Sequence, residues 1–399
     1  MGLPFMHQAF CIGGFAKICP NHGFISPASQ KALTCTCQYV LPYTLYARDL
    51  MLDFLKEPEE PPDHFFSLID EGIHGLIGFA AIHAACSLHL FDHLEKIPGT
   101  LHELSDATGI DEERLLPLLG VLLCSGVILS ENERYTNSPL ASTYLVSDSP
   151  YCQRSHIHKN AVFLEKIWAH LPERLIGGPL VFHHEEFFVD LALPAMAENA
   201  LAGRLQRTVG TIAGMPEFTT AKKMVDLGGG HGLYAIALSA LNPGLDAYIF
   251  DLPHVTVLAE RFIRHYYAAR VFTMPGNFFS DDIGSGYDLV LSSSNPSGKS
   301  PGLLRKISDA LNEGGLFVNV QSDDSDCDDA YHALEWQLWT LDNEEKGKGR
   351  YTREKLFMTG EYRAAMAEAG FRVVLEKHIT DDFHQGSSVH LVIAKKGAV

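Results

Sequence analysis

A glycine-rich segment between an expected strand and an expected helix constrains this chain more than any other feature. Residues 224–227 form a short apolar run that contains Asp226, the sequence Gly-Gly-Gly-His-Gly follows at 228–232, and a helical pattern runs from residue 233 to about 241. Glycines at a strand-to-helix turn let a ligand approach the backbone closely. The segment therefore predicts a cofactor bound at the carboxyl end of a strand.

The spacing within this segment narrows the kind of cofactor. Asp226, Gly228, Gly230 and Gly232 form the pattern acid-x-Gly-x-Gly-x-Gly, with the acid inside the strand end. A glycine-rich turn alone is a weak signal, because dinucleotide sites look similar. An acid at this point can hold a cationic amino-acid head group, which suits a cofactor without a pyrophosphate.

Three further positions at expected strand ends extend the predicted cofactor site. Asp251 ends the run 247–252, where an acid can bind ribose hydroxyls. Asn277 and Phe278 follow the third run, where an amide can contact an exocyclic nitrogen and a ring can pack on a purine. We also expect Ser292, at the end of the fourth run, to contact the cofactor.

The second half of the chain alternates short apolar runs with helical patterns. The runs are residues 224–227, 247–252, 271–274, 287–292, 316–320, 371–376 and 389–394. Strands that alternate with helices predict a mostly parallel sheet covered on both faces, here a Rossmann-like α/β fold with seven strands. Only a loop separates the last two runs, so the final strand is expected to return antiparallel.

The N-terminal segment differs in composition from the rest of the chain. Residues 1–48 contain no Asp or Glu, although the whole chain has a net charge of −18. Poverty in acidic residues is one mark of a transit peptide, whereas the Arg enrichment that usually accompanies it is missing. Residues 1–50 are thus expected to be either a targeting leader or a loosely ordered extension. The expected location is intracellular, in the cytoplasm or in a chloroplast or mitochondrion.

After a Pro-rich linker at 58–62, residues 63–150 predict a winged-helix-like domain. Helical patterns at 69–90, 101–108 and 111–124 precede a hairpin made of residues 127–129 and 134–136. A recognition helix needs several basic or amide side chains, whereas the second of the paired helices offers Glu112, Glu113 and Arg114 and then an apolar run, so we expect no nucleic-acid partner. Its apolar continuation, 115–129, predicts a subunit contact instead. Residues 151–215 are expected to form a helical substrate-binding segment, and 216–399 the catalytic domain.

Two other partner classes are not expected. We expect no membrane span, because no apolar run reaches the roughly 20 residues needed to cross a bilayer. The acidic run 323–329 could suggest a metal site, but adjacent carboxylates in a loop are usually solvated, so no metal is predicted.

From about residue 75 onward, the chain resembles the plant-type small-molecule O-methyltransferases, a family of S-adenosylmethionine-dependent enzymes that includes caffeate and hydroxyindole methyltransferases. The sequence segments that match the family are residues 225–232, 250–255, 276–279, 303–307 and 369–371. The resemblance implies S-adenosylmethionine as cofactor, a homodimer joined through the winged-helix domain, and Met196 over the substrate. Asn277 stands where the family usually has Asp.

The acid–base residues of that family are missing from this sequence. The family deprotonates its acceptor with a His after the fourth strand, but residues 292–300 contain no His. The two flanking carboxylates align with Gln321 and with a position near Gly349. Three losses together indicate a reaction in which no base removes a proton in this way.

A neutral thioether is an acceptor that needs no base. Related synthases of dimethylsulfoniopropionate methylate 4-methylthio-2-hydroxybutyrate, and such a thioether acid is the expected acceptor. Arg154 could bind its carboxylate, while Trp336 and Trp339, expected on one helix with Tyr331, could stabilise the sulfonium product. Two alternatives stay open: methylation of oxygen, nitrogen or carbon with His156, His158 or Tyr331 as a relocated base, and a non-catalytic relative that keeps the cofactor.

Overall fold

The computed structural model describes residues 55–295, 300–322, 330–342, 359–380 and 388–397. The predicted leader, the acidic run 323–329 and the position near Gly349 lie outside these ranges. The chain divides into two compact units, Met1–Leu68 and Ile69–Val399. Of the first unit, the described part is residues 55–68, which include the first turns of helix α2 (Asp63–Ser87).

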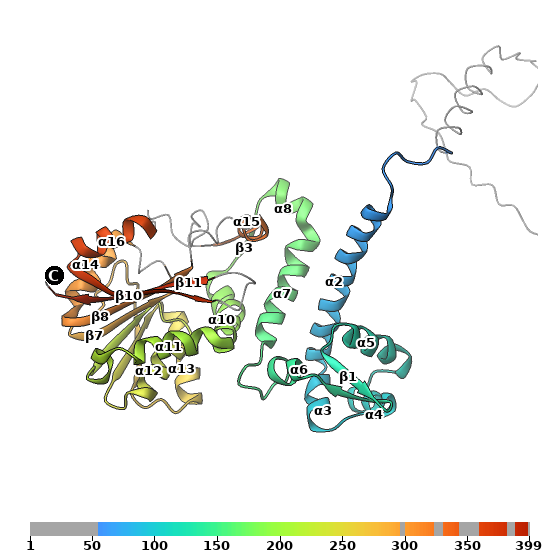
Figure 1. Cartoon of the computed structure of the whole chain (residues 1–399), viewed down its shortest axis with the longest axis horizontal. Helices are drawn as coiled ribbons and strands as arrows, with labels where there is room; N and C mark the ends of the chain where they lie inside the picture. The colour runs from blue at the N-terminus through green and yellow to red at the C-terminus, as the bar shows by residue number, and fades with distance from the viewer. Residues whose placement is uncertain (1–54, 296–299, 323–329, 343–358, 381–387, 398–399) are drawn as a thin grey trace, which may run out of the picture. The chain divides into compact units, whose positions relative to one another are not determined.

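A seven-stranded sheet forms the centre of the second unit, in the order β10-β11-β8-β7-β4-β5-β6 (Figure 1). Its parallel strands are β4 (Lys223–Leu227), β5 (Asp246–Asp251), β6 (Val271–Pro275), β7 (Tyr287–Ser293) and β8 (Leu311–Ser322). The last strand, β11 (Ser388–Lys396), runs antiparallel to β8 and to β10 (Phe371–Thr380). All seven apolar runs therefore form strands, and the predicted fold class and antiparallel return are confirmed.

Helices cover both faces of this sheet (Figure 1). Helices α11 (Leu205–Ala213), α12 (Leu233–Leu241) and α13 (Pro253–His265) pack on one face, where Met224 belongs to the core. Helices α14 (Pro301–Ala310) and α16 (Thr359–Glu368) pack on the other, where Val225 and Leu227 belong to a second core. Because side chains alternate along a strand, Asp226 points toward the α12 face, as Met224 does.

The part of the chain before the sheet contains the predicted helices and hairpin in the predicted order. Its elements are α2, α3 (Leu90–Lys96), α4 (Leu101–Thr108), α5 (Glu112–Cys124), β1 (Ile128–Glu131), β2 (Arg134–Asn137) and α6 (Pro139–Tyr144). A capping box between Thr100 and Glu103 begins α4. Asp111 occupies the N-cap of α5, although its side chain makes no capping hydrogen bond.

The exposed apolar surface of this region differs from the predicted one. Within the run 115–129, Leu115, Leu119 and Leu122 are fully buried, whereas Leu116 and Leu129 are 52% and 51% exposed. The exposed apolar side chains lie mainly on α2, namely Phe65, Phe66, Leu68, Ile69, Ile73, Leu76 and Ile77. The helical period of α5 turns Leu115, Leu119 and Leu122 toward α4 and the hairpin, so α2 adds a larger exposed apolar surface to the part of the run 115–129 that stays exposed.

Helix α2 is the feature that bears on the expectation about membranes. Among the described residues it is one helix that is long and apolar enough to cross a bilayer, judged by length and composition only. A single helix of this kind is weak evidence, because other apolar helices of soluble proteins pass the same test.

The segment between the two regions is helical, as predicted, with one exception. It contains α7 (Arg154–Lys166), η1 (Trp168–His170), α8 (Leu171–Gly177), α9 (His184–Glu186), η2 (Phe187–Ala192), α10 (Leu193–Asn199) and η3 (Ala200–Arg204). The exception is β3 (Leu180–Phe182), which pairs in parallel with β9 (Trp339–Leu341). Trp339 is therefore in a strand, whereas Trp336 is in helix α15 (Ala330–Gln337). The prediction of one helix for both was wrong.

Candidate active site

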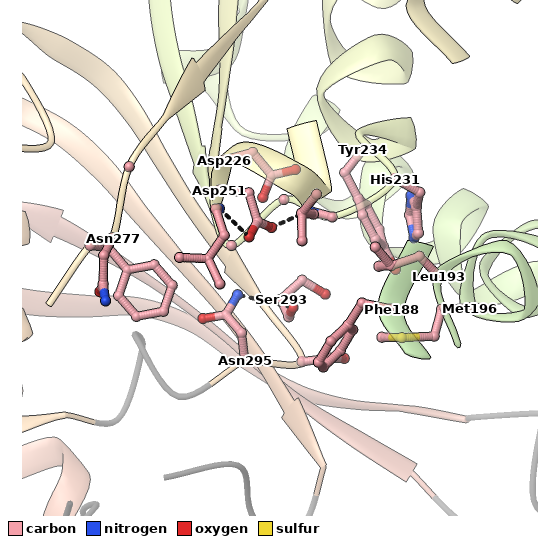
Figure 2. Close-up of a pocket in the computed structure, with 18 of the residues that line it drawn as sticks. Phe188, Leu193, Met196, Asp226, His231, Tyr234, Asp251, Asn277, Ser293 and Asn295 are labelled. Carbon is pink, nitrogen blue, oxygen red and sulfur yellow. Dashed lines mark hydrogen bonds between the residues drawn. The ribbon is translucent and has the colours of Figure 1, made fainter. Parts of the chain in front are cut away.

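A pocket lies at the carboxyl ends of β4, β5, β6 and β7. The glycine turn after β4, Asp226 and Asp251 line one side, and the loops after β6 and β7 contribute Asn277, Phe278 and residues 293–295. Segment 184–204, called the roof below, lines the opposite side with Phe188, Leu193 and Met196 (Figure 2). It also contributes His184 and Arg204. The pocket thus unites the predicted cofactor motifs with part of the predicted substrate segment.

The glycine turn has the left-handed backbone that glycine favours. Gly230 has φ +52°, and a Cβ there would lie 3.0 Å from Leu193 Cδ2 in the roof. Gly232 has φ +75°, but it does not line the pocket, and a Cβ there would lie 2.4 Å from Ile249 Cδ1 in the core. Gly230 therefore keeps the pocket open, whereas Gly232 serves the packing of α12 on the sheet, contrary to its predicted contact with the cofactor.

Asp226 is the most unusual polar group in the pocket. Its side chain is 1% exposed, and its Oδ2 has no hydrogen-bond partner among the described residues. Burial first, and the charge of Asp251 second, raise the pKa of Asp226 to about 8. A buried carboxylate without a partner is costly, so this position is suited to a cationic ligand group.

Asp251 is held by two backbone N–H groups. Its Oδ2 accepts a hydrogen bond from Gly230 N at 2.8 Å, and its Oδ1 accepts one from Leu252 N at 2.7 Å. Burial raises the pKa of Asp251 to about 6, although these two hydrogen bonds oppose the shift. The carboxylate is thereby fixed beside the glycine turn (Figure 2).

The loop after β6 brings Asn277 and Phe278 to the pocket, as predicted. Asn277 Oδ1 accepts a hydrogen bond from Phe279 N at 2.9 Å, and Phe278 packs against the Phe279 ring at 4.7 Å between centroids. Lys306 Nζ donates to Phe278 O at 3.0 Å. These contacts hold an amide and an aromatic ring at one end of the pocket.

Ser292 does not line the pocket, in contrast to its neighbour Ser293. It pairs with Leu227 in the sheet and therefore shares the face of α14 and α16, on which it is fully buried. Its hydroxyl donates to Asn295 Oδ1 at 3.1 Å, and Asn295 Nδ2 donates to Leu227 O at 2.7 Å. Ser292 therefore supports Asn295, which lines the pocket, and the prediction of a cofactor contact was wrong by one residue.

Met196 lies in the roof of the pocket, as expected (Figure 2). Two polar roof residues, His184 and Arg204, were not predicted. Residues 151–215 are rich in His, but no local pattern distinguishes His184 from the neighbouring histidines. Arg204 follows Gly203, whose φ of +131° breaks the helical path. A glycine inside a helical pattern was the available signal for this break.

The other pocket histidine, His231, is a poor proton acceptor. Its ring is 6% exposed, and Nδ1 accepts a hydrogen bond from Leu233 N at 3.1 Å. Burial first, and the charge of Arg204 second, lower the pKa of His231 to about 3. The ring is therefore neutral, with one nitrogen engaged by the backbone.

The predicted acceptor-binding residues other than Met196 do not line the pocket. Arg154 contacts Asp92 Oδ2 at 3.2 Å and also donates to Ser147 Oγ and Cys86 O. It joins α7 to α2 and α3 and does not line the pocket. Trp336 and Trp339 pack together in a separate aromatic core with 5.5 Å between ring centroids. Both were predicted to bind the acceptor, and both contribute to packing instead.

The three candidate bases are also outside the pocket lining. His156 hydrogen-bonds with Asn160 on α7, and His158 is exposed and stacks against His83. Tyr331 is 86% exposed on α15. The residue types were suitable, but neither histidine of α7 lines the pocket. Within the described residues, no group of His, Cys, Asp and Glu could hold a metal ion.

Comparison with known proteins gives the family. The O-methyltransferase domain family matches residues 196–372, and the O-methyltransferase dimerisation domain family matches residues 71–147. An uncharacterised protein of Methanocaldococcus jannaschii is 35% identical over 329 residues, which cover 80% of this chain and 88% of the relative. The chain belongs to the O-methyltransferase family.

The chain is also similar to proteins whose names state an activity. The N,N-dimethyltransferase OxyT of Streptomyces rimosus is 27% identical, covering 73% of this chain and 87% of OxyT. The fold matches the crystal structure of human N-acetylserotonin methyltransferase in complex with S-adenosylmethionine, with a TM-score of 0.63 at 20% identity over 86% of this chain and all of the human chain.

Family membership makes the chain a methyltransferase of small molecules with S-adenosylmethionine as cofactor. The pocket residues fit that group. The orphaned, buried Oδ2 of Asp226 suits the cofactor's ammonium, and Gly230 leaves room where any side chain would meet the roof. When bound, the cofactor supplies an electrophilic methyl group on a sulfonium.

Proposed function

We propose that each of the following pocket residues binds a particular part of the cofactor. Asp226 pairs with the ammonium, and Asp251 binds the ribose hydroxyls. Asn277 and Phe278 contact the adenine. Arg204 is the one Arg or Lys among the described lining residues, and its guanidinium suits the carboxylate at the amino-acid end of the cofactor. The buried hydroxyl of Tyr234, which has no hydrogen-bond partner among the described residues, supports a polar ligand group beside it.

We further infer that methyl transfer proceeds without a protein base, onto a neutral sulfur or nitrogen. The observation that carries this inference is the loop after β7. Its lining residues are Ser293, Ser294 and Asn295, and none of these side chains accepts a proton near neutral pH. Transfer to such an acceptor depends on orientation and on exclusion of water, which an apolar roof containing Phe188, Leu193 and Met196 can supply.

A thioether acid such as 4-methylthio-2-hydroxybutyrate is the first acceptor to test, which would link the enzyme to dimethylsulfoniopropionate biosynthesis. Its sulfur needs no deprotonation, and its carboxylate could share Arg204 now that Arg154 is engaged with Asp92. An amine is the next acceptor class, because OxyT is named as an N,N-dimethyltransferase.

O-methylation with a relocated base is the second candidate. One observation favours it: His184 lines the pocket, in the part of the chain where the sequence suggested such a base. His184 then replaces His156, His158 and Tyr331 as the residue that removes the proton. A homodimer through residues 71–147 accompanies either reaction and is supported by the apolar side of α2.

The test is transfer of a labelled methyl group from S-adenosylmethionine to a panel of thioether acids, amines, phenols and hydroxy acids. Preference for a thioether or an amine supports base-independent transfer. Turnover confined to phenols or alcohols would contradict it and favour His184 as a base.

A further inference from the structure

We propose that His184 is a positioning residue for the ribose hydroxyls of the cofactor, acting beside Asp251, and that His254 holds its ring for this purpose. This proposal rests on the ribose contact of Asp251 proposed above. It assigns a role to the buried histidine of the roof and to the histidine at the start of α13.

The position of the His184 ring is the first support. The side chain is 4% exposed, yet it lines the same pocket as Asp251 and Leu252. Its hydrogen-bond partner His254 follows Asp251 by three residues, at the start of α13, which places the ring near the end of β5. A buried imidazole is costly without polar partners, so this ring is expected to engage several.

Contacts with other described residues hold both the ring and the backbone of His184 in place. His184 Nδ1 lies 3.0 Å from His254 Nε2, a hydrogen bond in which one imidazole donates and the other accepts. The backbone N–H of His184 donates to Asp342 Oδ1 at 3.0 Å, just after β9. The ring also packs on Phe188 with 4.6 Å between centroids. The imidazole is therefore held between the roof and α13 instead of being free to rotate.

The chemistry of a ribose explains why a second group is useful. Each hydroxyl both donates and accepts, whereas a carboxylate only accepts. Both oxygens of Asp251 already accept backbone N–H groups, from Gly230 and Leu252. A neutral imidazole can donate or accept with its ring nitrogens, so His184 complements Asp251 where the carboxylate alone leaves a hydroxyl incompletely paired.

The experiment compares two ligands and matched variants. Calorimetry measures the dissociation constants of S-adenosylhomocysteine and of its 2′,3′-dideoxy analogue for the wild type and for His184→Phe, which keeps an aromatic ring against Phe188. We expect His184→Phe to weaken S-adenosylhomocysteine about tenfold, the loss of roughly one hydrogen bond, and to leave the dideoxy analogue unchanged. His254→Ala should shift the same ligand in the same direction by a smaller factor.

His183→Phe is the matched control, because that neighbouring ring is 75% exposed and hydrogen-bonds Asp342 outside the pocket. It should leave both constants unchanged. Equal weakening of both ligands by His184→Phe would overturn the proposal and leave His184 a packing residue, as would no weakening of either. If the wild type binds both ligands equally well, the ribose contact of Asp251 is wrong instead. Thermal melting of each variant identifies any that fail to fold.

Discussion

The carboxylate of Asp251 accepts a hydrogen bond from the backbone N–H of Gly230, with 2.8 Å between Asp251 Oδ2 and Gly230 N. The two residues are 21 positions apart and belong to the two strongest cofactor motifs of the sequence. Because this bond joins the tip of β5 to the turn after β4, the motifs form one unit. A change at either residue should disturb the other's contact with the cofactor.

Gly230→Val should abolish cofactor binding. A β-branched residue is strained at φ +52°, and its Cβ would meet Leu193 Cδ2 at 3.0 Å. Calorimetry with S-adenosylhomocysteine measures the effect. Gly210→Ala on α11 is the control, since no atom lies within 4 Å of a Cβ there, and binding should be unchanged. Wild-type affinity in a folded Gly230→Val variant would contradict the site.

Asp226→Asn should stabilise the cofactor-free protein at pH 8 while eliminating cofactor binding. The pKa of Asp226 is raised from 3.8 to about 8. Between these values the folded protein binds more protons than the unfolded chain, so the contribution of Asp226 to the free energy of unfolding falls as pH rises. An amide removes this contribution but cannot neutralise the cofactor's ammonium.

Melting temperatures from pH 5 to 8.5, with and without S-adenosylhomocysteine, measure both effects. The difference between Asp226→Asn and wild type should grow toward pH 8 without ligand, and ligand should stabilise only the wild type. Asp309→Asn, at an exposed aspartate of α14, should show neither effect. A pH-independent difference would show that Asp226 is ionised without its ligand.

Turnover at saturating substrates should lack a steep acidic limb. If the acceptor is a neutral sulfur, no proton leaves during transfer, and a base with a pKa near the usual ~6.5 of His is not required. His184→Phe should then reduce the maximal rate by much less than the ~10²–10⁴-fold expected for loss of a general base. A collapse of the maximal rate with unchanged binding constants would favour O-methylation.

Charges on the exposed side of α2 should dissociate the dimer. Ile73 and Ile77 are one helical turn apart and are 47% and 46% exposed. Ile73→Glu with Ile77→Glu keeps good helix formers but makes burial against a partner unfavourable. Light scattering should give a dimer for the wild type and a monomer for the double variant. Leu241→Glu, at a side chain 58% exposed on α12, should remain dimeric.

Arg154→Ala should destabilise the protein without changing ligand affinity. The guanidinium joins Asp92 to Ser147 and to Cys86 O, and its side chain is 23% exposed. Loss of these charge-assisted hydrogen bonds should cost about 1–3 kcal/mol in chemical denaturation. Unchanged stability together with weaker acceptor binding would restore the role predicted from the sequence.

Much of the fold and half of the cofactor site were predictable because they depend on local pattern. Each apolar run is long enough to form a buried strand, and the glycine turn combines a strand end with a helix start. Asp226, Gly230, Asp251, Asn277 and Phe278 line the pocket because the carboxyl ends of parallel strands meet at one edge. These positions follow from their place in a single repeated unit.

The errors fall where the geometry depends on neighbours in space. Ser292 and Ser293 are adjacent in the sequence, yet only Ser293 faces the pocket, since a shift of one residue reverses the face of a strand. Trp339 lies in a strand because β9 pairs with β3. The residue that pairs with Trp339 is Leu180, 159 positions earlier in the chain. Local propensity does not contain that pairing.

The sequence by itself determined the sheet, the glycine turn and the acids at the tips of β4 and β5, because alternation and turn chemistry act over a few residues. The tertiary structure alone decided which side chains close the pocket. His184 and Arg204 line the pocket, whereas Arg154, His156 and His158 on α7 do not. Contacts between distant segments decide which side chains line the pocket, and whether such contacts form depends on the packing of the whole chain.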